Sequence, residues 1–309
     1  MLQLAVYISY LFIIIAYSVK VAKIARMPLH LRWELYPVPH EKGYKYGGSY
    51  FEEVEWWNHI PRKNTWRSAA YLLKKYFLFN EYFWKKRAYW VTLYPWHVGF
   101  YLIVLFHILA FFGAVVLLAG IPVSAGSANT LGLAFYYLTI VVAVASFITG
   151  SFGSIGLLIE RLANKELRKY AAPVNYFNYT FFLIVFLSGL VAWFFDPGFS
   201  TYREFWKSLI TLKYSTVEAA TYTHVMLFSL FLIYLPFSRS THYITKFFSF
   251  FSVLWGDRPN LKGSDIEKQV DKLLDKPVTW AAPHIQSGQK WSEVASKMPE
   301  ETPEAGQKK

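Results

Sequence analysis

The chain has 309 residues, of which 54% are hydrophobic and 17% charged. Soluble domains are about a quarter charged, so this composition favours a membrane protein over a soluble one. The net charge of +12 flanks apolar runs instead of forming one patch, which argues against nucleic acid as a partner. The chain has no cysteine, which excludes disulfides, iron–sulfur clusters ligated by this chain and thioether-linked haem. Any redox metal would have to be held by histidine.

Several uncharged runs are long enough to cross a hydrocarbon core, which needs roughly 20 apolar residues. Residues 88–159 suffice for two spans that fold back at residues 120–129. The first run has its basic residues after the apolar stretch, which favours a retained anchor over a cleaved signal peptide. We therefore predict an all-α membrane protein with five transmembrane helices, at about 2–19, 92–119, 130–159, 175–195 and 216–243.

The basic residues predict the orientation of these helices. Residues 20–92 hold 14 Lys and Arg, residues 160–174 hold 4 and residues 239–309 hold 11, whereas the other two loops hold none and 3. Basic loops stay in the cytoplasm. The N-terminus is then outside and the C-terminus inside, in a multi-pass protein of the cytoplasmic (inner) membrane.

The predicted helices divide the chain into four parts. These are a first transmembrane helix (1–19), a cytoplasmic docking loop (20–91), a four-helix core (92–243) and a cytoplasmic tail (244–309). Within the loop, residues 27–58 are rich in Pro, Gly and aromatics and suggest ordered irregular structure. Residues 68–90 suggest either an interfacial helix or the aromatic belt at the headgroups. In the tail, residues 264–275 suggest an amphipathic helix with Ser264 as its N-cap.

Four histidines lie in or beside the apolar segments, where ionisable side chains are rare and usually functional. At 1.5 Å per residue, His97 and His107 lie about 15 Å apart along one helix, and His224 and His242 about 27 Å apart along another. Because these helices run in opposite directions, depth pairs His97 with His242 near the cytoplasm and His107 with His224 in the outer half. The result is two sites stacked across the membrane.

Two facing imidazoles can fill both axial positions of a haem iron, which leaves electron transfer as its task. A zinc or copper site would need three or four ligands at one depth. The remaining alternative is four histidines hydrogen-bonded within the bundle. We predict two b-type haems (protohaem IX), an inner one held by His97 and His242 and an outer one held by His107 and His224.

Neighbouring residues suit this prediction. Gly99, two residues after His97, offers a porphyrin face a place without a side chain. A glycine series at positions 150, 153 and 156 allows close approach of either a macrocycle or another helix.

Arg239, three residues before His242, and Arg161 are candidate partners for haem propionates. The alternative is cytoplasmic positive charge, which explains Arg239 less well. Pro236 would bend the fifth helix between its two ligands, as membrane helices tolerate.

The pattern H-x-G-x7-H at residues 97–107, together with P-F-S-R-x-x-H at 236–242 and His224, is specific. It resembles the cytochrome b, or gamma, subunit of respiratory nitrate reductase over residues 90–250. The resemblance implies five transmembrane helices, two b haems paired as above, and a quinol site near the outer haem.

The flanking segments 29–41, 47–53 and 277–285 instead resemble membrane cytochrome b subunits of heterodisulfide-reductase-like complexes. These form the DsrM, HmeC and TmcC group of sulfate reducers. The resemblance implies a cytoplasmic iron–sulfur partner similar to the catalytic subunit of heterodisulfide reductase. In some complexes it implies further membrane subunits or an external multihaem cytochrome c. The expected function is electron transfer between menaquinone, or that cytochrome, and the iron–sulfur partner, as one subunit of a quinone-linked oxidoreductase.

For the quinone, Glu218 and Tyr222 lie one to two turns outside His224. A carboxylate or phenol there could accept a quinol proton, although interfacial caps and belt aromatics have the same residue types. The rival function is a haem-free membrane anchor or small transporter subunit that uses its histidines for proton relay or packing.

Overall fold

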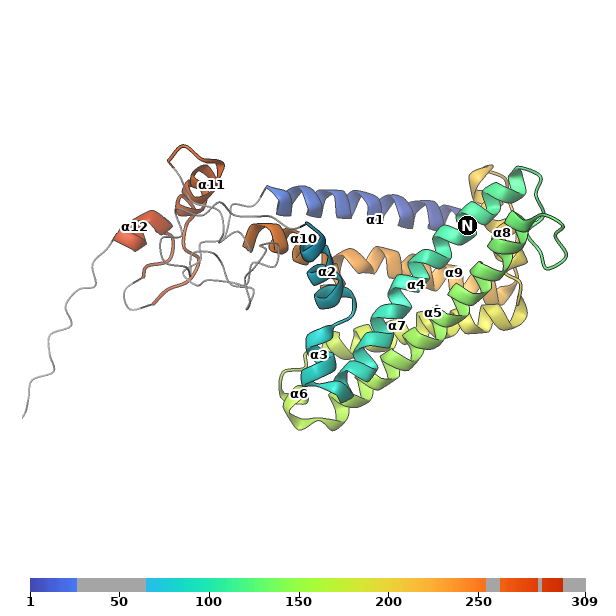
Figure 1. Ribbon diagram of the computed structural model, residues 1–309, viewed down its shortest axis with the longest axis horizontal. Helices are drawn as coiled ribbons and strands as arrows, with labels where there is room; N and C mark the ends of the chain where they lie inside the picture. The colour runs from blue at the N-terminus through green and yellow to red at the C-terminus, as the bar shows by residue number, and fades with distance from the viewer. Residues whose placement is uncertain (27–64, 254–261, 283–284, 297–309) are drawn as a thin grey trace, which may run out of the picture. The chain divides into compact units, whose positions relative to one another are not determined.

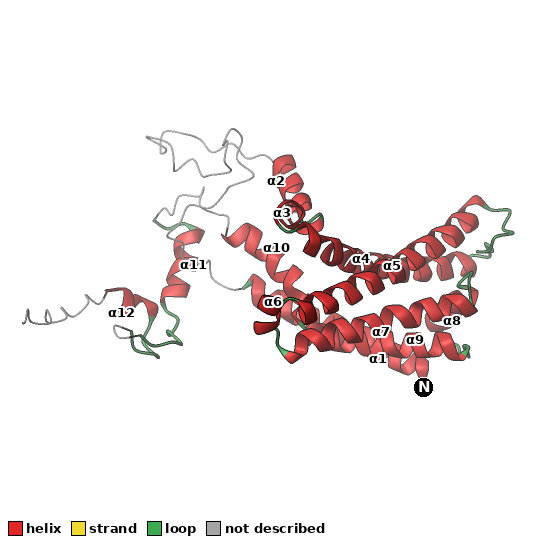
Figure 2. Ribbon diagram, turned by 90° about the horizontal axis from the view of Figure 1, so that it is seen from below, coloured by secondary structure: helices red, strands yellow, loops and turns green. Residues whose placement is uncertain are grey.

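The computed structural model describes residues 1–26, 65–253, 262–282 and 285–296. Within these ranges every regular element is helical, and the only strand-like pairing is two isolated bridges (Figure 2). Five helices of the described part are long and apolar enough to cross a membrane. The candidate spans are α1 (Leu2–Ala25), α4 (Arg87–Leu118), α5 (Thr130–Ala163), α7 (Pro173–Phe195) and α9 (Ala219–Tyr234, with its span running to Phe237). The predicted all-α fold is thereby confirmed for the described residues, and the five apolar helices suggest a multi-pass membrane protein.

The chain divides into two compact units. One comprises residues 1–17 and 72–240, and the other residues 18–71 and 241–309. The first unit, called here the bundle, holds the first part of α1 together with α4, α5, α7 and α9. It also holds the short helices α3 (Asn80–Lys85), α6 (Lys165–Lys169) and α8 (Ser200–Ile210).

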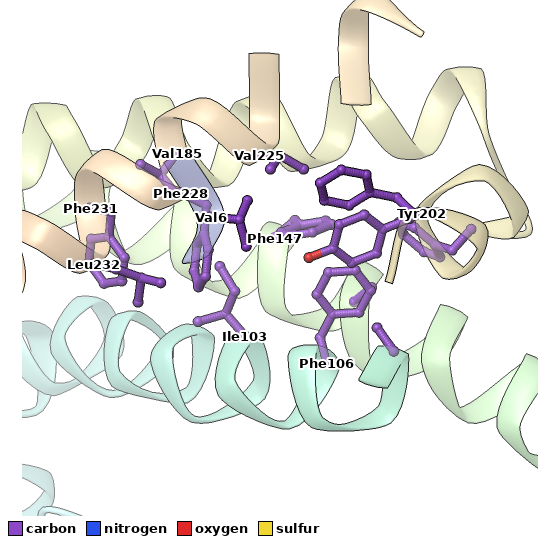
Figure 3. Packing of buried hydrophobic residues seen from close by; sticks show 14 of the residues in the cluster. Val6, Ile103, Phe106, Phe147, Val185, Tyr202, Val225, Phe228, Phe231 and Leu232 are labelled. Carbon is purple, nitrogen blue, oxygen red and sulfur yellow. The ribbon is translucent and has the colours of Figure 1, made fainter. Parts of the chain in front are cut away.

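Within the bundle, α4 packs on α5, α5 on α7 and α7 on α9, while α8 lies against α4 (Figure 1). Helix α1 is tied to α8 by two hydrogen bonds. The Gln3 amide donates to Ser208 Oγ (2.9 Å) and the Tyr7 hydroxyl donates to the Leu209 carbonyl (2.6 Å). The apolar side chains buried between these helices form one cluster, rich in phenylalanine (Figure 3).

The helix starts follow local chemistry. Asn129 caps α5 by accepting a hydrogen bond from the Leu131 amide at 2.9 Å. Helix α7 begins with Pro173, whose missing N–H is not needed at a first helical position. The loop between α4 and α5 comprises residues 119–129, so it agrees with the predicted fold-back at 120–129 within one residue.

The glycines of α4 and α5 form the contact between these helices. A Cβ on Gly99 would lie 2.5 Å from the Gly150 Cα, and a Cβ on Gly153 would lie 2.4 Å from the backbone nitrogen of Trp96. The Ser146 hydroxyl donates to the Gly99 carbonyl at 2.8 Å. The missing side chain of Gly99 thus serves helix packing in this structure, and not the porphyrin face that we expected there.

The predicted fifth helix, 216–243, is wrong at its end. Helix α9 stops at Tyr234 and passes into two 3₁₀ turns, Leu235–Phe237 (η4) and Arg239–Thr241 (η5). Pro236 is the physical reason, because proline has no N–H to donate and its ring clashes with the preceding turn. His242 therefore does not share a helix with His224; it is the first residue of α10 (His242–Val253). The distance of about 27 Å along one helix no longer applies.

Residues 68–90 do not form the single interfacial helix that their composition suggested. The segment comprises α2 (Thr65–Leu72), a π-helical turn (η3, Leu73–Phe77) and α3, after which α4 begins. Phe79 interrupts it with a left-handed backbone (φ 51°), and its buried ring packs inside the bundle. Burial of this ring outweighs the continuity of the helix.

In the second unit, the tail contains α11 (Asp265–Leu274) and α12 (Trp291–Ser296). The Ser264 hydroxyl accepts from the Glu267 amide at 3.1 Å, so the predicted N-cap is confirmed. A bridge between Pro277 and Lys290 closes the loop between the two helices around buried Val278. The predicted irregular loop, 27–58, lies outside the described residues, and so do the segments 29–41 and 47–53, on which part of the resemblance rests.

Candidate functional site

His107 lies in the middle of α4 and is 7% exposed. Its Nδ1 lies 2.7 Å from the Ile103 carbonyl, one turn earlier. A carbonyl can only accept, so Nδ1 carries the proton and donates it. Nε2 is then left with its lone pair, and it is buried with no hydrogen-bond partner among the described residues.

His224 on α9 repeats this arrangement with a different partner. The side chain is 3% exposed and its Nδ1 lies 2.9 Å from Ser188 Oγ on α7. The Ser188 hydroxyl donates its single hydrogen to the Val185 carbonyl at 2.8 Å, so it accepts from His224 Nδ1–H. His224 Nε2 is also buried, and no described residue bonds to it.

The two imidazoles border one aromatic cluster. Phe228 on α9 stacks on His107 with ring centroids 3.8 Å apart, and lies 6.3 Å from the ring of His224. Phe147 on α5 meets His224 edge-on at 5.4 Å. Figure 3 shows Phe147 and Phe228 in this cluster, between α4 and the opposite helices. The structure therefore brings together the outer pair predicted from depth.

Two aromatic side chains of helix α8 also lie near His107. The rings of Tyr202 and Trp206 lie 6.1 and 6.5 Å from the imidazole, and Tyr202 also stacks on Phe106 at 5.3 Å. Burial raises the pKa of the Tyr202 hydroxyl, which keeps this group neutral beside the histidine. His107 is thus enclosed by neutral aromatic groups.

The pair of His107 and His224 fits a haem better than a metal ion with three or four protein ligands or a proton relay. A buried nitrogen without a partner is unfavourable, and metal-bound histidines use one nitrogen for the metal while the other donates a hydrogen bond. In both His107 and His224, Nδ1–H donates a hydrogen bond and Nε2 is buried without a partner among the described residues. A pair of such neutral imidazoles would hold a haem iron. No group of three or more His, Cys, Asp or Glu able to hold a metal ion occurs in the described parts of the chain. His107 donates directly to a carbonyl, and His224 donates to the Ser188 hydroxyl, which in turn donates to the Val185 carbonyl. Carbonyl groups cannot pass a proton on, so a proton relay fits less well.

His97 lies about 15 Å from His107 along α4. Its Nδ1 lies 2.9 Å from the Leu93 carbonyl, so this imidazole also donates from Nδ1 to the preceding turn. Phe79 and Trp96 flank the ring at 4.5 and 5.1 Å. His97 is half-buried, with the same tautomer as His107.

The predicted partner of His97 belongs to the other compact unit. His242 begins α10 and is exposed within that unit. The pairing of His97 with His242 stays a prediction, because the two units are described separately.

The two predicted arginines have different surroundings. Arg161, at the end of α5, is half-buried and donates from Nη1 to the Leu167 carbonyl at 3.3 Å, and its own carbonyl accepts from the Tyr176 hydroxyl. Arg239 lies in η5 and is exposed. Arg161 thus joins α5 to the segment that follows it.

The predicted quinone residues lie at the start of α9, six and two residues before His224 but off the buried face that carries it. Glu218 is the N-cap residue and accepts from the Thr221 hydroxyl at 3.2 Å, and its side chain is exposed. Tyr222 is 43% exposed and lies roughly 200° around the helix from His224. Neither side chain shares the buried face of α9 that carries His224.

Two residues near the site were missed by the sequence reasoning. Ser188 orients His224, and an isolated serine in an apolar helix gives no signal of that role. Arg203 on α8 is 1% exposed. Its signal was a lone arginine among the three basic residues between the fourth and fifth predicted helices.

Comparisons of the chain with models of protein families, with curated proteins and with solved structures found no match.

Proposed function

We propose that this protein is a membrane cytochrome b subunit with two b-type haems, which carries electrons between menaquinone and a cytoplasmic iron–sulfur partner. One observation carries the proposal. His107 and His224, on two membrane-type helices, border the same aromatic cluster, and each has a buried Nε2 without a partner. Haems, when bound, supply one-electron transfer.

The chain's own residues would divide the work. His107 and His224 would hold the outer haem, with their Nδ1–H groups fixed by the Ile103 carbonyl and the Ser188 hydroxyl. These hydrogen bonds orient the rings and increase the basicity of Nε2. His97, with the same Nδ1 arrangement, would hold the inner haem together with His242.

The quinol site is proposed near the outer haem. Glu218 would accept a quinol proton and release it outside, with Tyr222 as the neighbouring phenol. Both side chains are exposed, as a site loaded from the bilayer requires. An external multihaem cytochrome c is the alternative donor. The proposed orientation, N-terminus outside, rests on the basic loops.

The partner and the wider assignment rest on the resemblance alone. The flanking segments point to a heterodisulfide-reductase-like iron–sulfur subunit on the cytoplasmic side, and the core to the nitrate reductase gamma subunit. Arg161 and Arg239, both on the side proposed to face the cytoplasm, would pair with propionates of the inner haem.

The test is a reduced-minus-oxidised spectrum of the purified chain, with protohaem extraction. We expect two b-type haems per chain. His107→Gly or His224→Gly should remove one haem and keep the other, and free imidazole should restore the lost one. Ser229→Ala, a buried change on the same helix as His224, should keep both.

Absence of extractable protohaem from the wild-type chain would overturn the proposal in favour of the haem-free anchor. If changing His97 and changing His224 removed the same haem, that result would instead overturn the pairing by depth. Reduction of the haems by a menaquinol analogue, and its loss in Glu218→Gln, tests the quinol site separately.

A further inference from the structure

Arg203 is the largest side chain that the bundle buries almost completely. Its Nη2 donates to the Val123 carbonyl at 3.4 Å and to the Gly198 carbonyl, and the guanidinium lies 5.6 Å from the centre of the Tyr136 ring. Nε and Nη1 are buried and find no hydrogen-bond partner among the described residues. The guanidinium charge therefore interacts with two neutral carbonyl groups and the Tyr136 ring.

Asp196 is the carboxylate that interacts electrostatically with Arg203, but its oxygens accept hydrogen bonds from other groups. Its two oxygens accept from the backbone amides of Ser200 and Thr201 at 2.9 and 2.8 Å, at the start of α8. No ion pair within 4 Å joins Asp196 to Arg203 in the described structure. Burial lowers the pKa of Arg203. The negative charge of Asp196 opposes this shift, so Asp196 partly compensates the buried positive charge.

This charge lies close to the outer pair of histidines. Tyr202, the residue before Arg203, contacts the ring of His107 at 6.1 Å. The Arg203 Cδ packs against α4 at Gly113, 3.2 Å from where a Cβ would lie. Gly113 is six residues beyond His107, which is about 9 Å along the helix. Buried groups at such a distance are poorly screened by salt.

We propose that Arg203 is a positioning charge that raises the reduction potential of the outer haem, the one held by His107 and His224. Reduction adds an electron, so a fixed positive charge nearby stabilises the reduced form. At about 10 Å and an effective dielectric constant of about 20, a unit charge changes such an equilibrium by roughly tenfold. The charge would thereby make the outer haem a better electron acceptor than it would be without Arg203. This inference rests on the proposed function.

The experiment is a redox titration of both haems in the intact protein, with the outer one identified by its loss in His107→Gly. Arg203→Gln should lower the reduction equilibrium constant of the outer haem about tenfold, which is about 59 mV for one electron, and leave the inner haem unchanged. Arg203→Lys keeps the charge and should keep most of the potential.

Asp196→Asn removes the compensating negative charge and should shift the same haem the opposite way, upward. Lys207→Gln is the matched control on the same helix, because Lys207 is only partly buried and paired with Glu204 at 3.0 Å. It should change neither potential.

Several results would overturn the inference. They are an unchanged outer potential in Arg203→Gln, an equal shift of both haems, or an Arg203→Lys shift as large as that of Arg203→Gln. If Arg203→Gln fails to assemble, Asp196→Asn decides, and a downward or absent shift there overturns the inference. A wild-type chain without protohaem would overturn the proposed function as well. Two haems with potentials insensitive to Arg203 would overturn this inference alone.

Discussion

Phe228 stacks on His107, with ring centroids 3.8 Å apart and ring planes at 13°. The lone pair of Nε2 lies in the plane of the imidazole, so a ring stacked on its face leaves that lone pair pointing along an edge. Phe228 therefore fixes the orientation of His107 without competing for the nitrogen that the proposed function requires.

Truncation of this ring should destabilise the bundle. Phe228→Ala removes a buried side chain of the apolar cluster that packs against His107 on α4, and we expect a loss of about 3–5 kcal/mol. Thermal unfolding in detergent, followed by circular dichroism, measures the change. Phe237→Ala is the control, because Phe237 is 74% exposed, and it should stay within about 0.5 kcal/mol of wild type. Equal unfolding temperatures for the two variants would contradict the stacking role.

Ser188 should matter for haem retention as well as for stability. Ser188→Ala leaves the Nδ1–H of His224 buried without its acceptor, which costs about 1–3 kcal/mol. Loss of such a supporting hydrogen bond typically weakens metal binding about 10–100-fold. Competition for haem with apomyoglobin measures this. Ser229→Ala, another buried serine-to-alanine change, should transfer haem no faster than wild type. Identical transfer rates for both variants would disprove the role of Ser188.

The close contact of α4 and α5 predicts intolerance of a single methyl group. In Gly99→Ala the new Cβ would lie 2.5 Å from a backbone atom of Gly150, so the helices must separate. We expect a loss of about 1–3 kcal/mol, as for other overpacked sites. Gly126→Ala is the matched change, since a Cβ there meets nothing within 4 Å. A Gly99→Ala protein as stable as Gly126→Ala would show that the helices are not held at this distance.

The absence of cysteine makes the orientation directly testable. A single cysteine at Ser124, between α4 and α5, should react with a membrane-impermeant maleimide in intact cells. A single cysteine at Lys165, after α5, should react only after the cells are opened. Both positions are exposed, so access alone does not separate them. The reverse labelling pattern would invert the proposed topology and move the quinol site to the cytoplasmic side.

The amino-acid sequence by itself determined the number and approximate bounds of the membrane-type helices. A span is a local property, since a run of about 20 apolar residues must satisfy its backbone hydrogen bonds internally. The Ser264 cap was predictable for the same reason, because the hydroxyl and the amide it binds are three residues apart. Spacing and direction also placed His107 and His224 at a common depth.

Only the tertiary structure decided what these residues contact. Whether Gly99 faces a porphyrin or Gly150 depends on the rotation of α4 against α5, which periodicity leaves open. The proton on His224 is placed by Ser188, 36 residues away on another helix. The buried position of Arg203 likewise depends on competition between local preference and packing across the chain. Non-local burial settles such competitions, and it exists only once the helices are assembled.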